Sequence, residues 1–576
     1  MDYALERFTA EVRRAIAATG RVPAGMIELA TPKPNIPADL AFPAFRVAKE
    51  LGVPAPQLAT ELAAAIAPAP GSLIGAVAAA GPFLNFSMGP EALAAAVVGE
   101  IQAAGEAYGR QDDGGGRRVV VDYSAPNIAK RMHVGHIRST IIGQAVVNIY
   151  RALGYEVLGD NHLGDWGKQF GVVLAAVERE GKPAAAGEAA LEELEAQYQR
   201  YTGAMKEDAA LDEAARRWSL RLEQGDPQAR ELWQWSVDMT MAAAQRNYDR
   251  LGVRIDHAYG ESFYEPMLAG VIQDALDKGV AFRDQGGAVV VENLANLPTF
   301  LLQRSDGGTL YMTRDVATIL FRMREFAPHK IVYVIGEPQS LHLRQLFALV
   351  RALGYTAEVE LVHVAFGTVF DEHGQPLSTR KGNMVYLEAL LDEAIARARE
   401  VVERKNPELP EDEKRAVAEA VGVGAVVYND LYQDPKRNIT LDWERMLATE
   451  GNSATYLQYS HARCRSILRR AGEDGGPGAE GADPALLTHP SETRLLKHLA
   501  RLPEALREAG ARYAPFVVAD WCYTTAREFG VFFEQCPVLK APSPELRAAR
   551  LALVAATATA LKSGLGLLGI RAPERM

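Results

Sequence analysis

Cysteine is scarce in this sequence. The 576 residues include three cysteines, Cys464, Cys522 and Cys536, with neither a CxxC pair nor a Cys/His cluster. A disulfide framework or a structural zinc site needs more such residues at closer spacing. The three side chains are therefore expected to be buried thiols, and no residue is predicted to ligate a metal.

Long apolar runs are also lacking. The longest uncharged stretch, residues 62–90, is rich in alanine but is interrupted by prolines and glycines, such as Pro68 and Gly81. A membrane span needs about 20 predominantly apolar residues. The N-terminus begins acidic and becomes amphipathic, without the apolar core and cleavage site of a signal peptide. We expect no membrane association and a cytoplasmic location.

Positive charge is in deficit. Lys and Arg number 62 against 73 Asp and Glu, a net charge of -11. Nonspecific nucleic-acid binding needs basic surface, so the total charge argues weakly against it. A local basic face on an acidic body remains open.

The chain is long enough for about three or four domains. Residues 1–115 alternate helical patterns with Pro-rich turns and close on the strand-like "GPFLNFSM", before the linker-like "DDGGG". From residue 387 to 576, helical spacing dominates. We predict a small α/β N-terminal domain and an all-helical C-terminal domain at these two ends.

The middle region, 116–386, shows strand and helix in alternation. "RRVVVDYSAPN" and "YEVLGDN" are strand patterns on either side of a helical one, and "HKIVYVIGEPQS" and "AEVELVHVAFG" repeat the arrangement. Such succession predicts right-handed crossovers in one doubly wound, Rossmann-type parallel sheet. The material near 175–235 and 262–308 is expected to form insertions with charged helical pattern.

The loop after the first of these strands carries "SAPNIAKRMHVGH". His133 and His136 lie at the start of the predicted helix, where the i, i+3 spacing places both imidazoles on one side, and Gly135 leaves room for a close approach. A helix N-terminus favours anions. Taken alone, two such histidines could be helix caps or surface groups. Because Ser124, Asn127 and Lys130 crowd the same loop, ATP binding is the better interpretation.

The sequence resembles the arginyl-tRNA synthetases, a family of class I, over essentially its whole length. The matching segments are, in order, "HVGH" at the HIGH motif, "GDWGKQFG", "LYMTRD", "IGEPQSLHLRQLF", "FGTV", "LSTRKGN", "LDWERMLATEGNSATYLQYSHAR" and "GLLGIRAPERM". The resemblance implies ATP-dependent attachment of L-arginine to tRNA(Arg) through an arginyl-adenylate. It further implies a monomer, and Mg²⁺ bound through ATP.

In terms of the family, His133 and His136 hold ATP and stabilise its α-phosphate. The second lysine-bearing motif is degenerate, since "QPLSTRKGN" has Thr379 at a lysine position. The resemblance implies that Lys130, just before the first motif, compensates. Arg380 and Lys381 add ATP contacts or are solvated loop charges.

The resemblance also implies an arginine pocket. Tyr311 and Asp315 are spaced i, i+4 in a helical pattern, and the family places them with Glu261 around the guanidinium. An ordinary salt bridge is the alternative for Asp315. The remaining implied contacts are Asn127 and Gln339 to the α-amino group, His162, Asp165 and Gln169 along the site, and His342 either at ATP or as a helix cap.

Contacts with tRNA are implied at both ends of the chain. Phe83 and Asn85 combine a stacking ring with an amide and are expected at the tRNA elbow, although Phe83 suits a core position nearly as well. The segment "YLQYSHARCRSILRR" mixes aromatic and basic residues, which suits an anticodon loop or an amphipathic core helix. The predicted contacts there are Tyr456, Tyr459, His461, Arg463 and Met576.

Two rival functions remain. Another class I synthetase, such as the cysteinyl enzyme, would be expected to carry a zinc cluster and to lack "YMTRD". A noncatalytic tRNA-binding paralogue would be expected to lose His133, His136 or Lys130, which this chain keeps.

Overall fold

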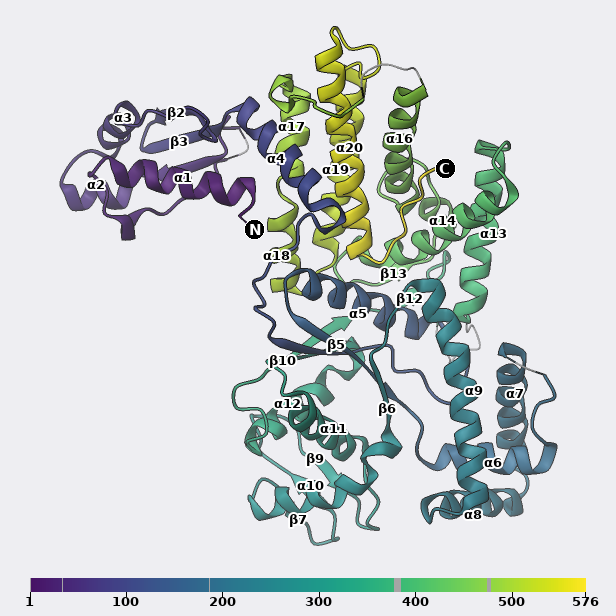
Figure 1. Cartoon of the computed structure of the whole chain (residues 1–576). Coiled ribbons are helices and arrows are strands. Elements are labelled where there is room, and N and C mark those ends of the chain that lie inside the picture. The colour runs from purple at the N-terminus through teal and green to yellow at the C-terminus, as the bar shows by residue number, and fades with distance from the viewer. Residues whose placement is uncertain (1, 34, 186, 378–384, 474–477) are drawn as a thin grey trace.

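The structure is a computed structural model that describes residues 2–33, 35–185, 187–377, 385–473 and 478–576. A parallel sheet lies at the centre, a helical bundle stands above it, and a small N-terminal module projects from the upper left (Figure 1). The predicted multidomain α/β class is confirmed. Among the described residues, no helix has the length and apolarity that crossing a membrane requires.

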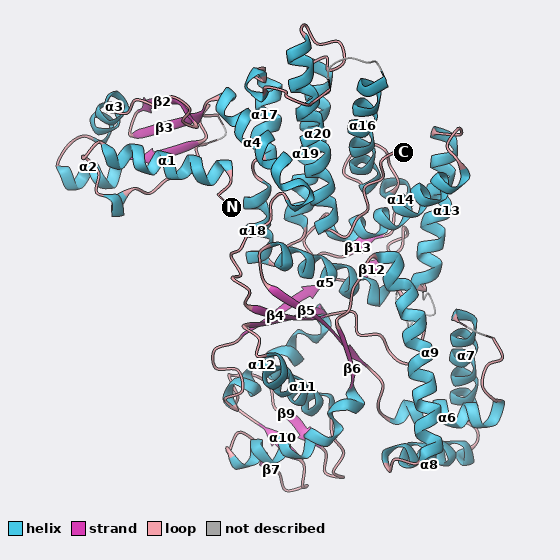
Figure 2. Cartoon of the chain, in the orientation of Figure 1, coloured by secondary structure: helices cyan, strands magenta, loops and turns pink. Residues whose placement is uncertain are grey.

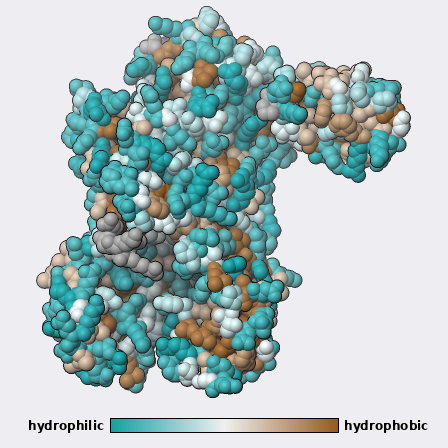
Figure 3. Space-filling view, turned by 180° about the vertical axis from the view of Figure 1, so that it is seen from behind, coloured by the Kyte–Doolittle hydropathy of each residue, from teal (hydrophilic) through white to brown (hydrophobic). Residues whose placement is uncertain are grey.

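The N-terminal module is a three-stranded antiparallel sheet covered by helices. Strand order is β1-β3-β2. In β3, Leu84, Phe86 and Met88 alternate into the core, as the period of two requires. Tan residues gather on this module in the view from behind, in keeping with the exposed alanines of β2 (Figure 3). Its elements are α1 (Ala4–Ala18), β1 (Leu40–Pro43), α2 (Phe45–Leu51), α3 (Ala55–Ala65), β2 (Ile74–Ala80), β3 (Phe83–Met88) and α4 (Pro90–Ala104).

The central sheet is parallel throughout, in the order β11-β10-β4-β5-β6. Val119 and Val121 face one core, and Val120 faces the other, because both sides of the sheet are covered. Four strands lie where the sequence predicts them. β6 was not expected, since its four residues include no run of β-branched side chains. The strands are β4 (Arg118–Asp122), β5 (Glu156–Leu163), β6 (His257–Gly260), β10 (Lys330–Gly336) and β11 (Glu360–Phe366).

Helices cover the two faces of this sheet. On the upper face lies α5 (Val134–Ala152), and below it lie α11 (Tyr311–Phe326) and α12 (Ser340–Ala352), as Figure 2 shows. α5 is buried along nearly its whole length, because the C-terminal bundle packs on its other side. The helix that carries the HVGH sequence is therefore held between sheet and bundle.

Two insertions interrupt the central domain. The first is helical, as predicted, but begins earlier and ends later than 175–235: α6 (Lys168–Glu180), α7 (Glu188–Ala204), α8 (Ala209–Glu223) and α9 (Pro227–Leu251). The second insertion contains the predicted helix and also antiparallel strands, which are too short to give a recognisable sequence pattern. It comprises a 3-10 turn, η3 (Glu261–Tyr264), followed by α10 (Glu265–Asp277), β7 (Phe282–Arg283), β8 (Val289–Val291) and β9 (Phe300–Gln303).

The described part of the C-terminal region is helical, as predicted, apart from a two-residue strand. That strand, β13 (Ile439–Thr440), pairs in parallel with β12 (Val369–Phe370) at a point of contact with the central domain. The three cysteines are buried and free, as predicted. The helices are α13 (Leu387–Lys405), α14 (Glu411–Leu431), α15 (Trp443–Met446), α16 (Ala454–Glu473), α17 (Pro490–Leu499), α18 (Leu502–Arg512), α19 (Phe516–Gln535) and α20 (Pro544–Leu567).

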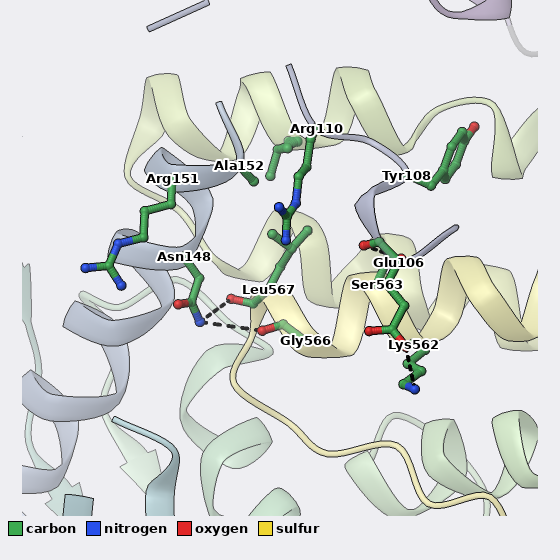
Figure 4. A pocket seen from close by; sticks show the side chains of 11 residues that line it. Glu106, Tyr108, Arg110, Asn148, Arg151, Ala152, Lys562, Ser563, Gly566 and Leu567 are labelled. Atoms are coloured by element: carbon green, nitrogen blue, oxygen red, sulfur yellow. Dashed lines mark hydrogen bonds and ion pairs between the residues drawn. The ribbon is translucent and has the colours of Figure 1, made fainter. Parts of the chain in front are cut away.

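Polar contacts join the units. Arg138 of α5 donates to both carboxylate oxygens of Asp430 in α14, and each side chain is about 1% exposed. A pocket of about 370 Å³ lies where the linker after α4, the end of α5, α18 and α20 meet (Figure 4). There, Asn148 donates to the carbonyl of Leu567 at 3.3 Å, and Lys562 pairs with Glu106 at 2.6 Å. The contacts of Arg138 and Asn148 fix α5 to the bundle, and the Lys562 pair fixes the linker after α4 to α20.

Candidate functional site

The N-terminus of α5 is capped by its own histidines. His133 is the N-cap, and its Nδ1 accepts a hydrogen bond from the Gly135 N–H at 3.0 Å. The Nδ1 of His136 accepts one from the His133 N–H at 3.2 Å. A Cβ on Gly135 would lie 2.7 Å from the His133 ring, so only glycine fits beneath that imidazole. The space above Gly135, expected to admit a ligand, is occupied by the His133 ring.

This capping fixes the tautomer of both rings. A neutral imidazole that accepts at Nδ1 carries its proton on Nε2. Burial lowers the pKa of His136 to about 3, and burial together with the charge of Lys130 lowers the pKa of His133. Both rings are therefore neutral near pH 7 and present Nε2–H donors at a helix N-terminus, an arrangement that suits an anion. We call Lys130, His133, Gly135 and His136 the phosphate side.

The loop before α5 has an unusual backbone. Ser124, Ala125 and Ala129 all have positive φ, between 50° and 77°. Residues with a side chain rarely adopt such angles, and they keep them only where contacts with the surrounding protein hold the backbone in place. The Ser124 hydroxyl forms buried hydrogen bonds with the hydroxyls of Tyr248 and Thr140. Its predicted role in ATP binding stays a prediction, and the structure assigns the side chain a part in holding the loop.

Two further residues of this loop, Asn127 and Lys130, were predicted to contact the substrates. Asn127 is exposed, and its Oδ1 lies over Gly164, just beyond β5. Lys130 is half-buried, with its Nζ 5.7 Å from the centre of the Tyr198 ring in α7. Arg380 and Lys381 lie outside the described residues.

A group of carboxylates lies at the ends of the neighbouring strands. Glu261 follows β6 directly and is buried, and Arg314 of α11 lies 3.8 Å away. Burial raises the pKa of Glu261 to about 7; Arg314 opposes this change, and Asp315 and Asp165 add to it. A buried carboxyl with this pKa is ready to ionise when a cation arrives. We call Asp165, Glu261 and Asp315 the acidic side.

Asp165 holds the turn that carries Glu261. Its two carboxylate oxygens accept from the N–H and the hydroxyl of Ser262, at 2.9 and 2.6 Å. A Cβ on Gly260 would lie 1.9 Å from Asp165, so the carboxylate packs directly on the backbone there. The sequence predicted Asp165 along the site, and in the structure Asp165 holds the backbone next to Glu261.

Asp315 pairs with His342 of α12, Oδ2 to Nε2, at 2.5 Å. Burial opposes a charge on His342, but the hydrogen bond and charge of Asp315 raise its pKa above the ordinary value. The alternatives considered for His342, an ATP contact or a cap, did not include this pairing. Tyr311, at the start of α11, is 67% exposed. Gln339, directly before α12, is also exposed and so open to a ligand.

Contacts between neighbouring loops lie along the sheet edge between the two sides. His162, near the end of β5, stacks on Tyr264 with ring centres 5.6 Å apart, and its buried Nδ1 has no hydrogen-bond partner among the described residues. Asn127, between β4 and α5, meets Gly164 after β5. The carboxyl ends of β4, β5, β6 and β10 thus bring the predicted residues to one edge, where ligands bind in such sheets.

Sequence reasoning missed a buried ion network beneath this edge. Arg322 of α11 donates to Asp122 at 2.6 Å and to Asp160 at 2.7 Å, and its side chain is fully buried. Asp122 and Asp160 face each other on β4 and β5. An acidic residue late in each of two adjacent strand patterns was the available signal, but the arginine lies more than 160 residues away from both.

The predicted elbow contacts lie on the outer face of the N-terminal sheet. Phe83 is 39% exposed and packs edge-to-face against Phe45, which is 54% exposed. Asn85 points to the same side two residues later. Phe83 is thus a surface residue and not part of the core, the other reading of the sequence.

The predicted anticodon contacts of α16 divide by exposure. Tyr459 is 44% exposed, and exposed Arg463 stacks over Phe533, 4.2 Å from the ring centre. Tyr456 is half-buried. His461 is 1% exposed and its Nδ1 contacts the Pro573 carbonyl, which joins α16 to the tail. The RNA contact predicted for it stays a prediction. Met576 packs on the apolar cluster between α13 and α14.

Three family profiles match the chain. The arginyl tRNA synthetase N terminal domain matches residues 6–88, the catalytic domain of tRNA synthetases class I (R) matches 98–443, and the DALR anticodon binding domain matches 457–576.

Individual proteins match over the same extent. An arginine–tRNA ligase of Chloroflexus aggregans is 69% identical over 576 residues, all of both chains, and one of Edwardsiella ictaluri is 43% identical over 80% of each. A structure of Thermus thermophilus arginyl-tRNA synthetase has a TM-score of 0.79 at 27% identity, covering 98% of this chain and 100% of that one. A Plasmodium falciparum arginyl-tRNA synthetase has the same TM-score at 22% identity, covering 99% of each, and supports the fold alone.

Proposed function

The chain belongs to the arginyl-tRNA synthetases and is an ATP-dependent arginine–tRNA ligase, and on that premise we propose a role for each side of the site. The phosphate side binds ATP, and the acidic side binds the guanidinium of L-arginine. One observation carries the proposal: neutral N–H donors at the α5 N-terminus and a buried carboxyl of raised pKa share one edge of the sheet.

On the phosphate side, His133 and His136 donate from Nε2 to the α-phosphate as the arginine carboxylate attacks it. Negative charge builds up there in the transition state, and fixed donors stabilise it without reorganising. Lys130 supplies the positive charge that the degenerate second motif lacks. Mg²⁺ would be held mainly by the phosphates of ATP, since a small hard cation prefers phosphate and water oxygens, and it would offset part of their negative charge. The bond between the α-phosphorus and the β-phosphate oxygen breaks, so this step gives the arginyl-adenylate and releases pyrophosphate. A hydroxyl at the 3′ end of the tRNA then attacks the arginyl carbonyl, which transfers arginine to the tRNA and releases AMP.

On the acidic side, Glu261 and Asp315 accept from the guanidinium, with Tyr311 next to them. A planar cation with five donors fits paired carboxylates, and a neutral side chain would leave Glu261 buried with only the more distant Arg314 as a cationic partner. Asn127 and Gln339, both exposed at strand ends, hold the α-amino group. Such a pocket discriminates by about 10⁴-fold without an editing step.

For the tRNA, we propose that Phe83 and Asn85 contact the elbow, and that Tyr459 and Arg463 contact the anticodon loop. These four side chains are at least partly exposed, two on the N-terminal module and two on α16 of the helical bundle. We further propose that the protein acts in the cytoplasm and, as the family resemblance implies, as a monomer. The division into domains at 1–115, 116–386 and 387–576 is part of the same proposal.

The experiment is charging of total tRNA with each amino acid in turn, beside Lys130→Ala. We expect arginine alone to be attached, and the variant to lose at least about tenfold in kcat/KM for ATP, because a phosphate charge loses its partner. Lys206→Ala, an exposed lysine between α7 and α8, is the matched control and should charge normally. Normal charging by Lys130→Ala would remove Lys130 from the proposal.

A further inference from the structure

The first insertion packs against the loop that carries Lys130. Ala129 of the loop is buried in an apolar cluster with Val173, Val177 and Leu194 of the insertion. Its N–H donates to the Thr240 hydroxyl of α9 at 3.0 Å. Ala129 has a φ of 63°, which a residue with a side chain rarely adopts unless its neighbours hold it there. The insertion therefore fixes the backbone directly before Lys130.

Two consecutive basic side chains of the loop meet one face of α7. Lys130 lies over the ring of Tyr198, and Arg131 donates to Glu195 at 3.1 Å. Glu195 and Tyr198 are spaced i, i+3, so they lie next to each other on the helix. Arg131 also stacks 3.5 Å above the Tyr386 ring.

Tyr386 links this arrangement to the other side of α5's N-terminus. The segment 385–387 forms bridges with 132–134: the Val134 N–H donates to the Val385 carbonyl, and the Leu387 N–H donates to that of Met132. The loop of the phosphate side is thus held on one side by α7 and on the other by the residues before α13.

Resting on the proposed role of Lys130 in the reaction, we propose that Tyr198 is a positioning residue, whose ring face holds the Lys130 ammonium beside His133 and His136. An ammonium over an aromatic face is attracted by the ring's electron density, and this attraction does not use up its N–H donors in hydrogen bonds. The three donors of the lysine thus remain available to a phosphate. The geometry gives the helical insertion a function: it aims a charge at ATP without touching ATP.

The test compares two substitutions at one position in the full-length protein. Tyr198→Phe keeps the ring face, and Tyr198→Leu removes it while keeping an apolar side chain. We expect Tyr198→Leu to lower kcat/KM for ATP about three- to tenfold, the range for a partly desolvated cation–π contact, and Tyr198→Phe to stay within about twofold of the parent protein. The KM for arginine should not change in either.

A structural role would give a different pattern. Tyr201→Leu removes a neighbouring ring of α7 that is 3% exposed and packs in a different cluster of the insertion, so it should lower the unfolding temperature but spare kcat/KM for ATP. An equal ATP defect in Tyr201→Leu, or a Tyr198→Phe variant as poor as Tyr198→Leu, would overturn the proposal.

A double variant separates this inference from the proposed function. If Tyr198 acts through Lys130, then Tyr198→Leu causes no further loss in the Lys130→Ala background. An undiminished loss there would overturn the inference and leave the role of Lys130 intact. If Lys130→Ala alone charges normally, the proposed role of Lys130 fails, and the inference with it.

Discussion

Burial shifts pKa values in opposite directions on the phosphate side and the acidic side, and in both cases it favours the uncharged form of the buried group. Burial lowers the pKa of His136 to about 3 and raises that of Glu261 to about 7. Near neutral pH, the imidazole is uncharged, and a large share of the carboxyl is protonated. The His136 imidazole and the Glu261 carboxyl are thus largely uncharged without a ligand. His136 offers a donor to an anion, and Glu261 offers an acceptor to a cation.

The difference lies in how each side is held. The histidines are fixed by hydrogen bonds within a single helix turn. The acidic side depends on separate elements: Asp165 after β5, Glu261 after β6, and Asp315 on α11 with His342 on α12. A local motif can therefore be read from the sequence, whereas the acidic side requires the whole sheet to be assembled.

The largest effect is expected on the phosphate side. His136→Ala should lower kcat for arginylation about 100- to 1,000-fold, as for the loss of one donor to a transition-state anion. His136→Asn keeps an acceptor for the His133 N–H but lacks the Nε2–H donor, so it should be similarly impaired. Steady-state charging decides the matter: near-normal activity of His136→Asn would reduce His136 to a helix cap.

On the acidic side, Glu261→Gln should weaken arginine binding about 30- to 1,000-fold, because the substrate cation loses a buried partner. Titration calorimetry with arginine measures this directly, and the KM for ATP should stay constant. Glu265→Gln is the matched control, since Glu265 also pairs with Arg314 but is only half-buried. A comparable loss in the control would mean that Arg314, and not the substrate, sets the requirement.

The two sides should also differ in pH dependence. Glu261 has a raised pKa near 7 and binds a cation only as the carboxylate, so below pH 7 a proton must leave first. The KM for arginine should therefore rise towards about tenfold per pH unit as the pH falls through 6, and level off above 7. Glu261→Gln should abolish this slope. Over the same range His136 does not titrate, and a matching slope in the KM for ATP would contradict the assignment.

The smallest effect concerns His342. His342→Ala removes the partner of Asp315 and should raise the KM for arginine about three- to tenfold, in line with one hydrogen bond to a charged group. His342→Gln places a donor near the position of Nε2 and should recover most of the loss. Equal defects in both variants would point to the packing of α12 instead of the pair.

Much of the site could be predicted from short segments. The strand, loop and helix around HVGH were evident because the signal lies within some 30 residues. Exposure was harder to predict: α16 has aromatic and basic residues at helical spacing, yet Tyr459 faces solvent and His461 is buried. The residues on each face depend on what packs against the helix, which a single amphipathic pattern leaves open.

The local chemistry follows from short segments of the amino-acid sequence: two histidines around a glycine at a helix start, a lysine three residues before them, and the pair Tyr311 and Asp315 one helical turn apart. Their relative placement depends on backbone geometry over a few residues. Other contacts exist only in the assembled fold: Arg322 joins Asp122 to Asp160, Asp165 supports Glu261, and Tyr198 lies under Lys130. Such contacts join elements far apart in the chain, and their charges and pKa values depend on burial that exists only once those elements pack together.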